Sequence, residues 1–168
     1  MSKTPIPVTL ELNGRRVFAW VPPNKSLLHA LREDFGATDV KYGCGEGVSG
    51  TCTVLLDGEP VNACLMFAAQ AGDRTVVTLS GLRKEDGDLH PLQRSFLEHG
   101  GSQCGFCTPG MVLTALHYAE GGGSTDREAI RDALSGNLCR CTGYSKIVDA
   151  VEGYVAAQAG NGQAKARG

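Results

Sequence analysis

The seven cysteines of this 168-residue chain fall into two groups. One group is spread over a single stretch, and the other consists of two close pairs; they are Cys44, Cys52 and Cys64, then Cys104, Cys107, Cys139 and Cys141. In a reducing compartment, clustered cysteines mark metal or redox sites more often than disulfides. An odd total fits neither paired disulfides nor two complete four-thiolate sites. It fits two four-ligand sites in which one ligand is replaced.

The first group lies around the glycine-rich run YGCGEGVSGTCTV, residues 42–54. Plant-type [2Fe–2S] sites have the spacing C-x4-C-x2-C, followed by a distant fourth cysteine. Counted from Cys44, the second thiol falls at position 49, where the chain has Ser49. Cys52 and Cys64 complete the pattern. Because the glycines permit positive φ and a close approach of backbone N–H groups to sulfur, we interpret the run as a cluster loop with one altered ligand.

Ser49 leaves three alternatives open for this first site. In the first, the serine lies at or near iron as an alkoxide, because bound Fe(III) lowers the pKa of a ligand strongly. In the second the cluster is partial or degraded, and in the third the domain folds without it. An alkoxide is a harder donor than a thiolate and favours the ferric state, so the first alternative predicts a lowered reduction potential.

The second group lies in QCGFCTPG, residues 103–110, and NLCRCTGY, residues 137–144. Each cysteine pair precedes a predicted helix, whose free N–H groups and positive dipole would stabilise thiolates and an anionic cluster. Two such helix ends facing each other would form a four-sulfur cage. From the spacing alone, an iron–sulfur cluster, zinc held by four cysteines and ordinary core thiols remain alternatives. The C-x-C pair is unusual among zinc sites, which favours iron–sulfur.

Two kinds of secondary structure are expected to position these cysteines. Before residue 82 the pattern is that of strands, with hairpin turns at Asn13-Gly14 and Asp57-Gly58. The other elements expected there are a helix over 26–35, a short helix over 64–71 and a strand over 74–81. These elements predict a small mixed-sheet domain.

After a polar stretch over 82–90, the apolar spacing becomes helical. Helices are expected over 90–99 and 108–120, after a capping box of Thr125 and Glu128, and over 142–159. Four such segments suggest a small helical bundle. The predicted division is therefore a first domain over 1–82, a helical domain over 83–160 and a disordered tail over 161–168.

Charge and hydropathy exclude several classes of function. A net charge of −2 gives no basic face for nucleic acid. No run approaches the roughly 18 apolar residues of a membrane span, so no membrane association is predicted. The first residues have neither an apolar h-region nor a twin-arginine leader, and the expected location is therefore cytoplasmic.

The two motif sets together resemble a known family. GCGEGxxGxCTV…NACL followed by QCGFCTPG…LSGNLCRCTGY is similar to the small iron–sulfur subunit of the molybdenum hydroxylases, the relatives of xanthine dehydrogenase, aldehyde oxidoreductase and carbon monoxide dehydrogenase. The resemblance covers about residues 8–156. It implies an α+β chain: an N-terminal β-grasp, plant-type ferredoxin-like domain followed by a C-terminal four-helix-bundle [2Fe–2S] domain.

The resemblance also implies cofactors, partners and site residues. The implied cofactors are two [2Fe–2S] clusters on this chain, with molybdopterin on a large partner subunit and FAD on a medium one. The implied metal ligands are Cys44, Ser49 in place of the family cysteine, Cys52 and Cys64 for the outer cluster, and Cys104, Cys107, Cys139 and Cys141 for the inner one. Gln103 matches the family glutamine that hydrogen-bonds the pterin, and Cys141 matches the ligand nearest to it.

The expected function is that of an electron-transfer subunit, which relays single electrons from the molybdenum centre to a flavin or another acceptor. By resemblance, the whole complex hydroxylates an N-heterocycle, a purine or an aldehyde, or oxidises carbon monoxide. No Ser-His-Asp or paired-carboxylate arrangement stands out, so no catalytic residue is predicted and the chain alone is expected to catalyse nothing. The alternative is a zinc-stabilised binding module without redox activity.

Overall fold

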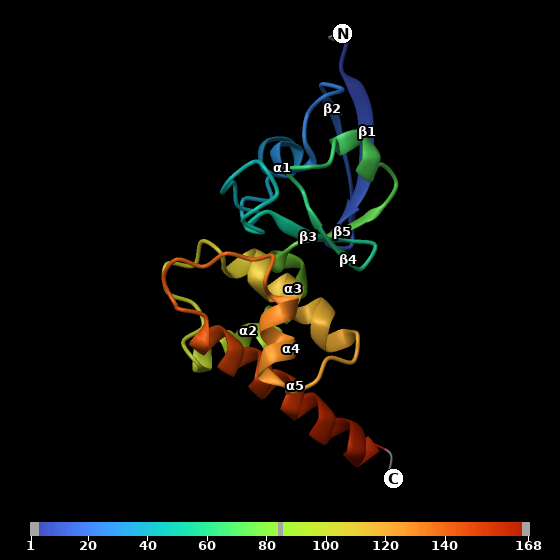
Figure 1. Ribbon diagram of the computed structural model, residues 1–168. Coiled ribbons are helices and arrows are strands. Elements are labelled where there is room, and N and C mark those ends of the chain that lie inside the picture. The colour runs from blue at the N-terminus through green and yellow to red at the C-terminus, as the bar shows by residue number, and fades with distance from the viewer. Residues whose placement is uncertain (1–3, 84–85, 166–168) are drawn as a thin grey trace.

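The computed structural model describes residues 4–83 and 86–165, with side chains as far as Ala159 in the last helix. It consists of a small sheet and a group of helices packed against one end of that sheet (Figure 1). In chain order the elements are β1 (Ile6–Leu12), β2 (Arg15–Val21), α1 (Leu27–His29), the π-helical turn η1 (Ala30–Asp34), β3 (Thr53–Leu56), β4 (Glu59–Asn62), the 3₁₀ turn η2 (Ala68–Ala71), β5 (Thr75–Val77), the 3₁₀ turn η3 (Leu79–Leu82), α2 (Pro91–Glu98), α3 (Thr108–Glu120), α4 (Arg127–Ala133) and α5 (Ser145–Lys165).

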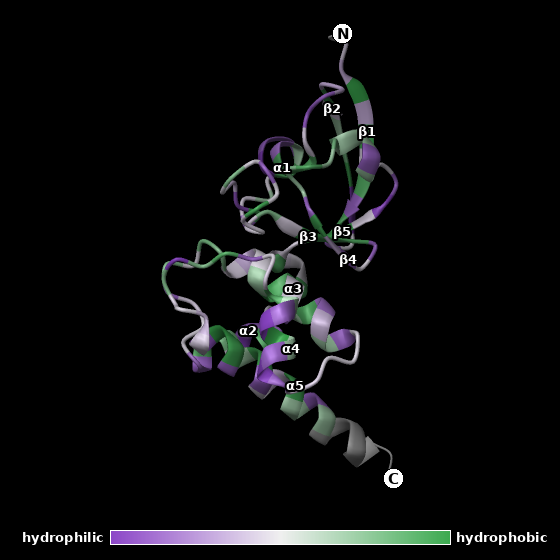
Figure 2. Cartoon of the chain, in the orientation of Figure 1, coloured by the Kyte–Doolittle hydropathy of each residue, from purple (hydrophilic) through white to green (hydrophobic). Residues whose placement is uncertain are grey.

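The five strands form one mixed sheet in the order β2-β1-β5-β3-β4. Both predicted hairpins are confirmed: β1 pairs antiparallel with β2, and β3 with β4. Their first turn residues, Asn13 and Asp57, have φ of +52° and +51°, which Asn and Asp tolerate better than most residues. Hydrophobic and hydrophilic residues alternate along β1 (Figure 2), and one face of this strand is buried.

The expected helix over 26–35 is present but changes its winding. Ser26 caps α1 by accepting a hydrogen bond from the His29 N–H at 3.3 Å. The chain then forms the π-helical turn η1, in which the Phe35 N–H donates to the Ala30 carbonyl. Leu27, Leu28 and Leu31 are buried under the sheet, so this segment supplies the core beneath the first cysteine loop.

Two elements of the first domain are shorter than predicted, because tertiary hydrogen bonds take their backbone groups. The segment over 64–71 is helical only in η2, since the Leu27 N–H donates to the Met66 carbonyl at 2.7 Å and a bridge pairs Ser26 with Phe67. The strand expected over 74–81 ends at Val77. There the Asn13 side chain accepts from the Thr78 N–H at 2.8 Å and ends the ladder.

The helical domain is built from α2 to α5 around one apolar core. The helices expected over 90–99 and 108–120 are confirmed as α2 and α3. The central side chains of this core are fully or almost fully buried; they are Leu92, Phe96, Met111, Leu113, Ile130, Leu134, Ile147 and Val151. Leu55 of β3 packs into the same core, which joins the sheet to the helices.

Two expectations about helix ends need correction. The N-cap of α4 is Asp126, whose carboxylate accepts from the Ala129 N–H at 3.2 Å, rather than Thr125 in a box with Glu128. Asp is at least as good an N-cap as Thr, and it lies one residue nearer the helix. The prediction of a disordered tail over 161–168 also needs correction, because α5 continues to Lys165 in the structure. Residues 166–168 lie outside the described part.

No helix within the described residues is long and apolar enough to cross a bilayer.

Where the two domains meet, α3 approaches the first cysteine loop without room for a side chain. A Cβ on Gly110 would lie 2.2 Å from the Gly50 carbonyl oxygen. Gly110→Ala is therefore expected to lower the free energy of unfolding by roughly 1–3 kcal/mol through overpacking, although alanine is intrinsically better in a helix by about 1 kcal/mol. Chemical denaturation followed by circular dichroism measures the change.

Gly136→Ala is the matched control, because a Cβ there would meet nothing within 4 Å. Equal stabilities of the Gly110 and Gly136 variants would contradict the close contact between α3 and the loop.

Candidate metal centres

The first cysteine loop connects η1 to β3 and places Cys44 beside Ser49. The Ser49 hydroxyl donates to the Cys44 sulfur at 3.2 Å, and the Glu46 N–H donates to the same sulfur at 3.4 Å. These two bonds lower the pKa of the Cys44 thiol to about 6, with the serine hydroxyl as the larger cause. The structure therefore brings together the two positions that the spacing had paired, with the serine side chain directed at sulfur.

Cys52 and Cys64 complete the first group from the two ends of the β3–β4 hairpin. Cys52 immediately precedes β3 and is buried, whereas Cys64 follows β4 and is half-buried. Burial raises the pKa of the Cys52 thiol to about 11, and the neighbouring Cys64 and Cys44 add to this effect. The predicted donors of the first site, three sulfurs and one hydroxyl oxygen, therefore come from the loop and from both hairpin ends.

Sequence reasoning missed the side chain that supports this loop. The amide of Asn62, at the end of β4, donates to the Gly47 carbonyl at 3.1 Å. The Cys52 thiol lies 3.9 Å from the Asn62 side-chain oxygen, which places this residue behind two parts of the site. Asn62 is the N of the NAC motif, so the motif contained the signal, although its role does not follow from spacing.

The second group gathers from two loops of the helical domain. The Cys141 and Cys104 sulfurs are 3.5 Å apart and both residues are exposed. Cys107 is buried, and burial, together with its neighbours Cys139 and Cys104, raises the pKa of its thiol to about 12. Cys139 is half-buried, so the four predicted residues of this group lie near one another with two exposed, one half-buried and one buried.

The predicted placement at helix N-termini is confirmed for one cysteine pair and differs for the other. Cys107 is the N-cap of α3, as expected. Cys141, however, is separated from α5 by residues 142–144.

Side chains of this short connection take the place of helix N–H groups. The Thr142 hydroxyl donates to the Cys139 sulfur at 3.1 Å, and the Cys139 N–H donates to the Tyr144 hydroxyl at 3.0 Å. Burial raises the pKa of Cys139, but the hydroxyl and N–H of Thr142 outweigh it and bring the pKa below its usual value. Both residues belong to the CTGY motif, which was noted as a pattern without a role for either side chain.

Gln103, predicted to face a pterin, is exposed and adjoins Cys104. Two large apolar side chains near the second group, Phe106 and Leu138, are also exposed, at 47% and 51%. The surface around the second group is therefore partly apolar and contains both exposed cysteines.

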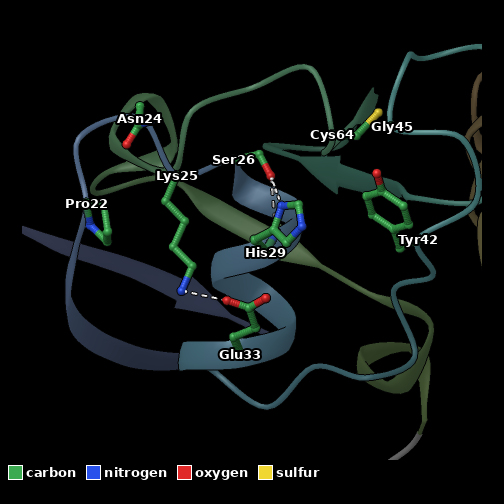
Figure 3. A pocket seen from close by; sticks show the side chains of 9 residues that line it. All are labelled: Pro22, Asn24, Lys25, Ser26, His29, Glu33, Tyr42, Gly45 and Cys64. Atoms are coloured by element: carbon green, nitrogen blue, oxygen red, sulfur yellow. Dashed lines mark hydrogen bonds and ion pairs between the residues drawn. The ribbon is translucent and has the colours of Figure 1, made fainter. Parts of the chain in front are cut away.

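A polar cavity of about 540 Å³ lies beside the first group (Figure 3). Cys64, Gly45 and Tyr42 line one side of it, and His29 of α1 faces Tyr42, with ring centroids 5.5 Å apart. On the opposite side, Lys25 forms an ion pair with Glu33 at 2.9 Å. This cavity makes the edge of the first site accessible from solvent.

The donor chemistry fits iron–sulfur clusters. Soft thiolates in sets of four select iron–sulfur clusters or zinc, and the first loop has the plant-type spacing except at Ser49. Within residues 4–83 and 86–165, no three His, Cys, Asp or Glu side chains gather as a site for a single metal ion, and this includes the cysteines of both groups. The spacing of the motifs, rather than a preformed single-ion site, makes the two sulfur groups the residues that would hold two-iron clusters.

Both halves of the chain match iron–sulfur families. Residues 10–77 match the 2Fe-2S iron-sulfur cluster binding domain, and residues 78–152 match the [2Fe-2S] binding domain. Two [2Fe–2S] clusters are thus the cofactors of this chain, one for each domain. The zinc-stabilised alternative finds no support in these matches.

Similar proteins include subunits of bacterial oxidoreductases. The chain is 52% identical over 146 residues to the nicotinate dehydrogenase small FeS subunit of Eubacterium barkeri, with 87% of this chain and 92% of the relative covered. It is 45% identical to the nicotine 6-hydroxylase small subunit of Paenarthrobacter nicotinovorans, with 87% of each chain covered. In the crystal structure of quinoline 2-oxidoreductase from Pseudomonas putida 86, one chain matches with a TM-score of 0.89 and 41% identity, covering 96% of this chain and 99% of that one.

The similarity to these relatives extends along almost the whole chain. It leads to the same kind of protein as the two cysteine motifs and the two sulfur groups of the structure. The α+β fold, with a ferredoxin-type domain before a helical one, is the fold of the quinoline oxidoreductase chain. The chain therefore belongs to the family of small [2Fe–2S] iron–sulfur subunits of the molybdenum hydroxylases.

Proposed function

We propose that this chain relays single electrons within a molybdopterin-dependent hydroxylase or dehydrogenase complex and has no catalytic residue of its own. The observation that carries the proposal is the pair of sulfur groups in one small chain, of which the second presents two exposed cysteines on a partly apolar surface. An electron relay needs one site at the surface that faces its donor. With the proposed domain boundary between residues 82 and 83, each domain contains one of the two sites.

The proposed ligands follow the two sulfur groups, and each group has its own hydrogen-bond donors. Cys104, Cys107, Cys139 and Cys141 would hold the inner cluster, and Cys44, Ser49, Cys52 and Cys64 the outer one. A bound [2Fe–2S] cluster supplies a one-electron carrier whose potential depends on hydrogen bonds to sulfur and on exposure. The Thr142 hydroxyl, which donates to Cys139, and the Glu46 N–H, which donates to Cys44, are the donors that would tune these potentials.

The proposed partners follow from the surfaces around the sites. A large molybdopterin-binding subunit would cover the second site, with Gln103 and Cys141 nearest to the pterin. An FAD-binding medium subunit would cover the first site, where Val48, Leu65 and Phe67 are exposed at 61%, 64% and 52%. The proposed location of the complex is the cytoplasm. Because nicotinate, nicotine and quinoline name the relatives, we propose an aromatic N-heterocycle as the substrate class.

Purification of the native complex through a tag on this chain tests the proposal. We expect a larger chain with stoichiometric molybdenum to co-purify, and about four iron atoms per small chain, two for each cluster. The preparation should be red-brown and should bleach with dithionite. The matched control is the same tagged chain expressed alone, which should bind iron but oxidise no substrate. Full substrate turnover by the isolated chain, or a colourless zinc protein, would contradict the proposal.

A further inference from the structure

The two cysteine loops contact each other directly, through a cluster of backbone and side-chain groups that we call the loop junction: Ser49, Gly50, Gly136, Asn137 and Leu138. The Leu138 N–H donates to the Ser49 carbonyl at 2.9 Å. The Asn137 side-chain amide donates to the Gly50 carbonyl at 3.0 Å and lies 3.5 Å from the Thr53 hydroxyl. A residue next to Cys139 is thus hydrogen-bonded to the residue that replaces the outer-site thiolate.

Asn137 is a buried polar residue, with 4% of its surface exposed. Its target, the Gly50 carbonyl, also accepts from the N–H of Thr53 at 3.1 Å and from its hydroxyl at 2.7 Å. Three donors from two domains therefore converge on one oxygen. If the loops moved apart, the buried Gly50 carbonyl would lose a donor without gaining water, which costs its desolvation free energy. These hydrogen bonds therefore favour one relative position of the two loops.

Backbone groups approach so closely at the junction that side chains are excluded. Gly50 has φ of +65°, and a Cβ on it would lie 2.4 Å from the Gly136 carbonyl oxygen. On its other side the Gly50 carbonyl faces Gly110 of α3. Contact between rigid backbone segments, unlike contact between long side chains, transmits position with little slack.

We propose that Asn137 is a positioning residue that holds the two cluster-bearing loops at a fixed separation and so sets the rate of electron exchange between the two sites. The inference rests on the proposed function for its consequence, but its structural part, the locking of the loops, stands on the contacts alone. One electron leaves one site, which is oxidised, and enters the other, which is reduced; no bond or proton has to move at the junction. The two loops are linked by the hydrogen bond from the Leu138 N–H to the Ser49 carbonyl, and Cys139 is the residue after Leu138.

Two substitutions of Asn137 in the intact complex separate the hydrogen bond from packing. Asn137→Asp keeps the volume but removes the donor to the Gly50 carbonyl, and Asn137→Ala removes the volume as well. In both variants we expect amide hydrogen exchange in a peptide over 136–141 to become about tenfold faster or more, in line with the loss of a buried hydrogen bond. The magnetic splitting between the two reduced clusters in the EPR spectrum should weaken, and electron exchange between the sites should slow.

Asn13→Asp is the matched control, because it also removes a side-chain amide donor at constant volume, but in the β1–β2 turn, where Asn13 donates to the Thr78 hydroxyl at 3.0 Å. It should leave exchange over 136–141 and the magnetic splitting unchanged. The proposal is overturned if either Asn137 variant keeps both wild-type exchange and wild-type splitting, or if Asn13→Asp changes them as much. A complex without two EPR signals would instead refute the proposed function, while the exchange measurement would still decide whether Asn137 locks the loops.

Discussion

Cys139→Ala is expected to abolish iron binding at the second site and to unfold the helical domain. Cys139 is half-buried and packs against the core that α2 to α5 share. Its sulfur accepts a hydrogen bond from the Thr142 hydroxyl, and its N–H donates to the Tyr144 hydroxyl. This residue therefore joins the metal site to the connection before α5. Removing it takes away a ligand and opens a gap at the edge of the core.

The expected size of this effect follows from the coupling of metal binding to folding. In small metal-binding domains the apparent binding free energy is about 10–16 kcal/mol for structural zinc, whereas a whole domain is stable by only about 5–15 kcal/mol. A domain of this size that loses a comparable contribution from its cluster has little stability left. The neighbouring cysteine Cys107, buried and close to Cys139, would then be a thiol without metal.

Iron content per chain and helical circular dichroism measure the outcome. We expect iron to fall by about half, from two clusters to one, together with most of the helical signal. Thr142→Val is the matched control: it keeps the shape of the side chain and removes only the hydroxyl that donates to Cys139. It should shift the potential of the second site but retain iron and fold. Wild-type iron and helicity in Cys139→Ala would show that Cys139 is not a ligand.

Local signals in the sequence predicted most of this architecture. The Asn13-Gly14 and Asp57-Gly58 turns fixed both hairpins because their conformations depend on only two residues. The apolar spacing of 108–120 likewise predicted α3, because burial of one helical face is encoded within the segment itself. The cysteine groups were found for the same reason, since their spacing is a property of short stretches.

The features that the sequence did not predict depend on contacts between distant segments. The strand after Arg74 ends early because Asn13, 65 residues from Thr78, takes its backbone N–H. The segment at Met66 bonds to Leu27 instead of forming a helix. Asn137 is the first residue of the NLCRCTGY motif and received no predicted role, yet it is buried against a carbonyl 87 positions earlier. Each of these bonds competes successfully with local propensity, which is worth less than about 1 kcal/mol per residue.

Ser49→Cys is expected to raise the reduction potential of the first site and to speed steady-state turnover of the complex, without changing the affinity for the substrate. The serine hydroxyl lies 3.2 Å from the Cys44 sulfur, at the position where the plant-type spacing has a thiolate. A hard oxygen ligand favours the ferric state, so exchange for a softer thiolate makes reduction easier. For a one-electron step, each change of about 59 mV is a tenfold change in equilibrium, so roughly 100 mV would change the ratio of reduced to oxidised first site some fiftyfold.

Substrate oxidation itself should be unaffected by this substitution, because the Ser49 side chain contacts Cys44 of the first site, whereas the Ser49 carbonyl that contacts Leu138 is kept. Reduction of the second site by substrate should therefore proceed at the same rate in both forms, and only the onward step should change. EPR-monitored redox titration of the wild type, Ser49→Cys and Ser49→Ala is the decisive measurement. Ser49→Ala removes the hydroxyl altogether, so it should lose the first signal if the serine is an iron ligand. Identical potentials for the first site in all three proteins, with full iron content, would show instead that Ser49 only donates a hydrogen bond to Cys44.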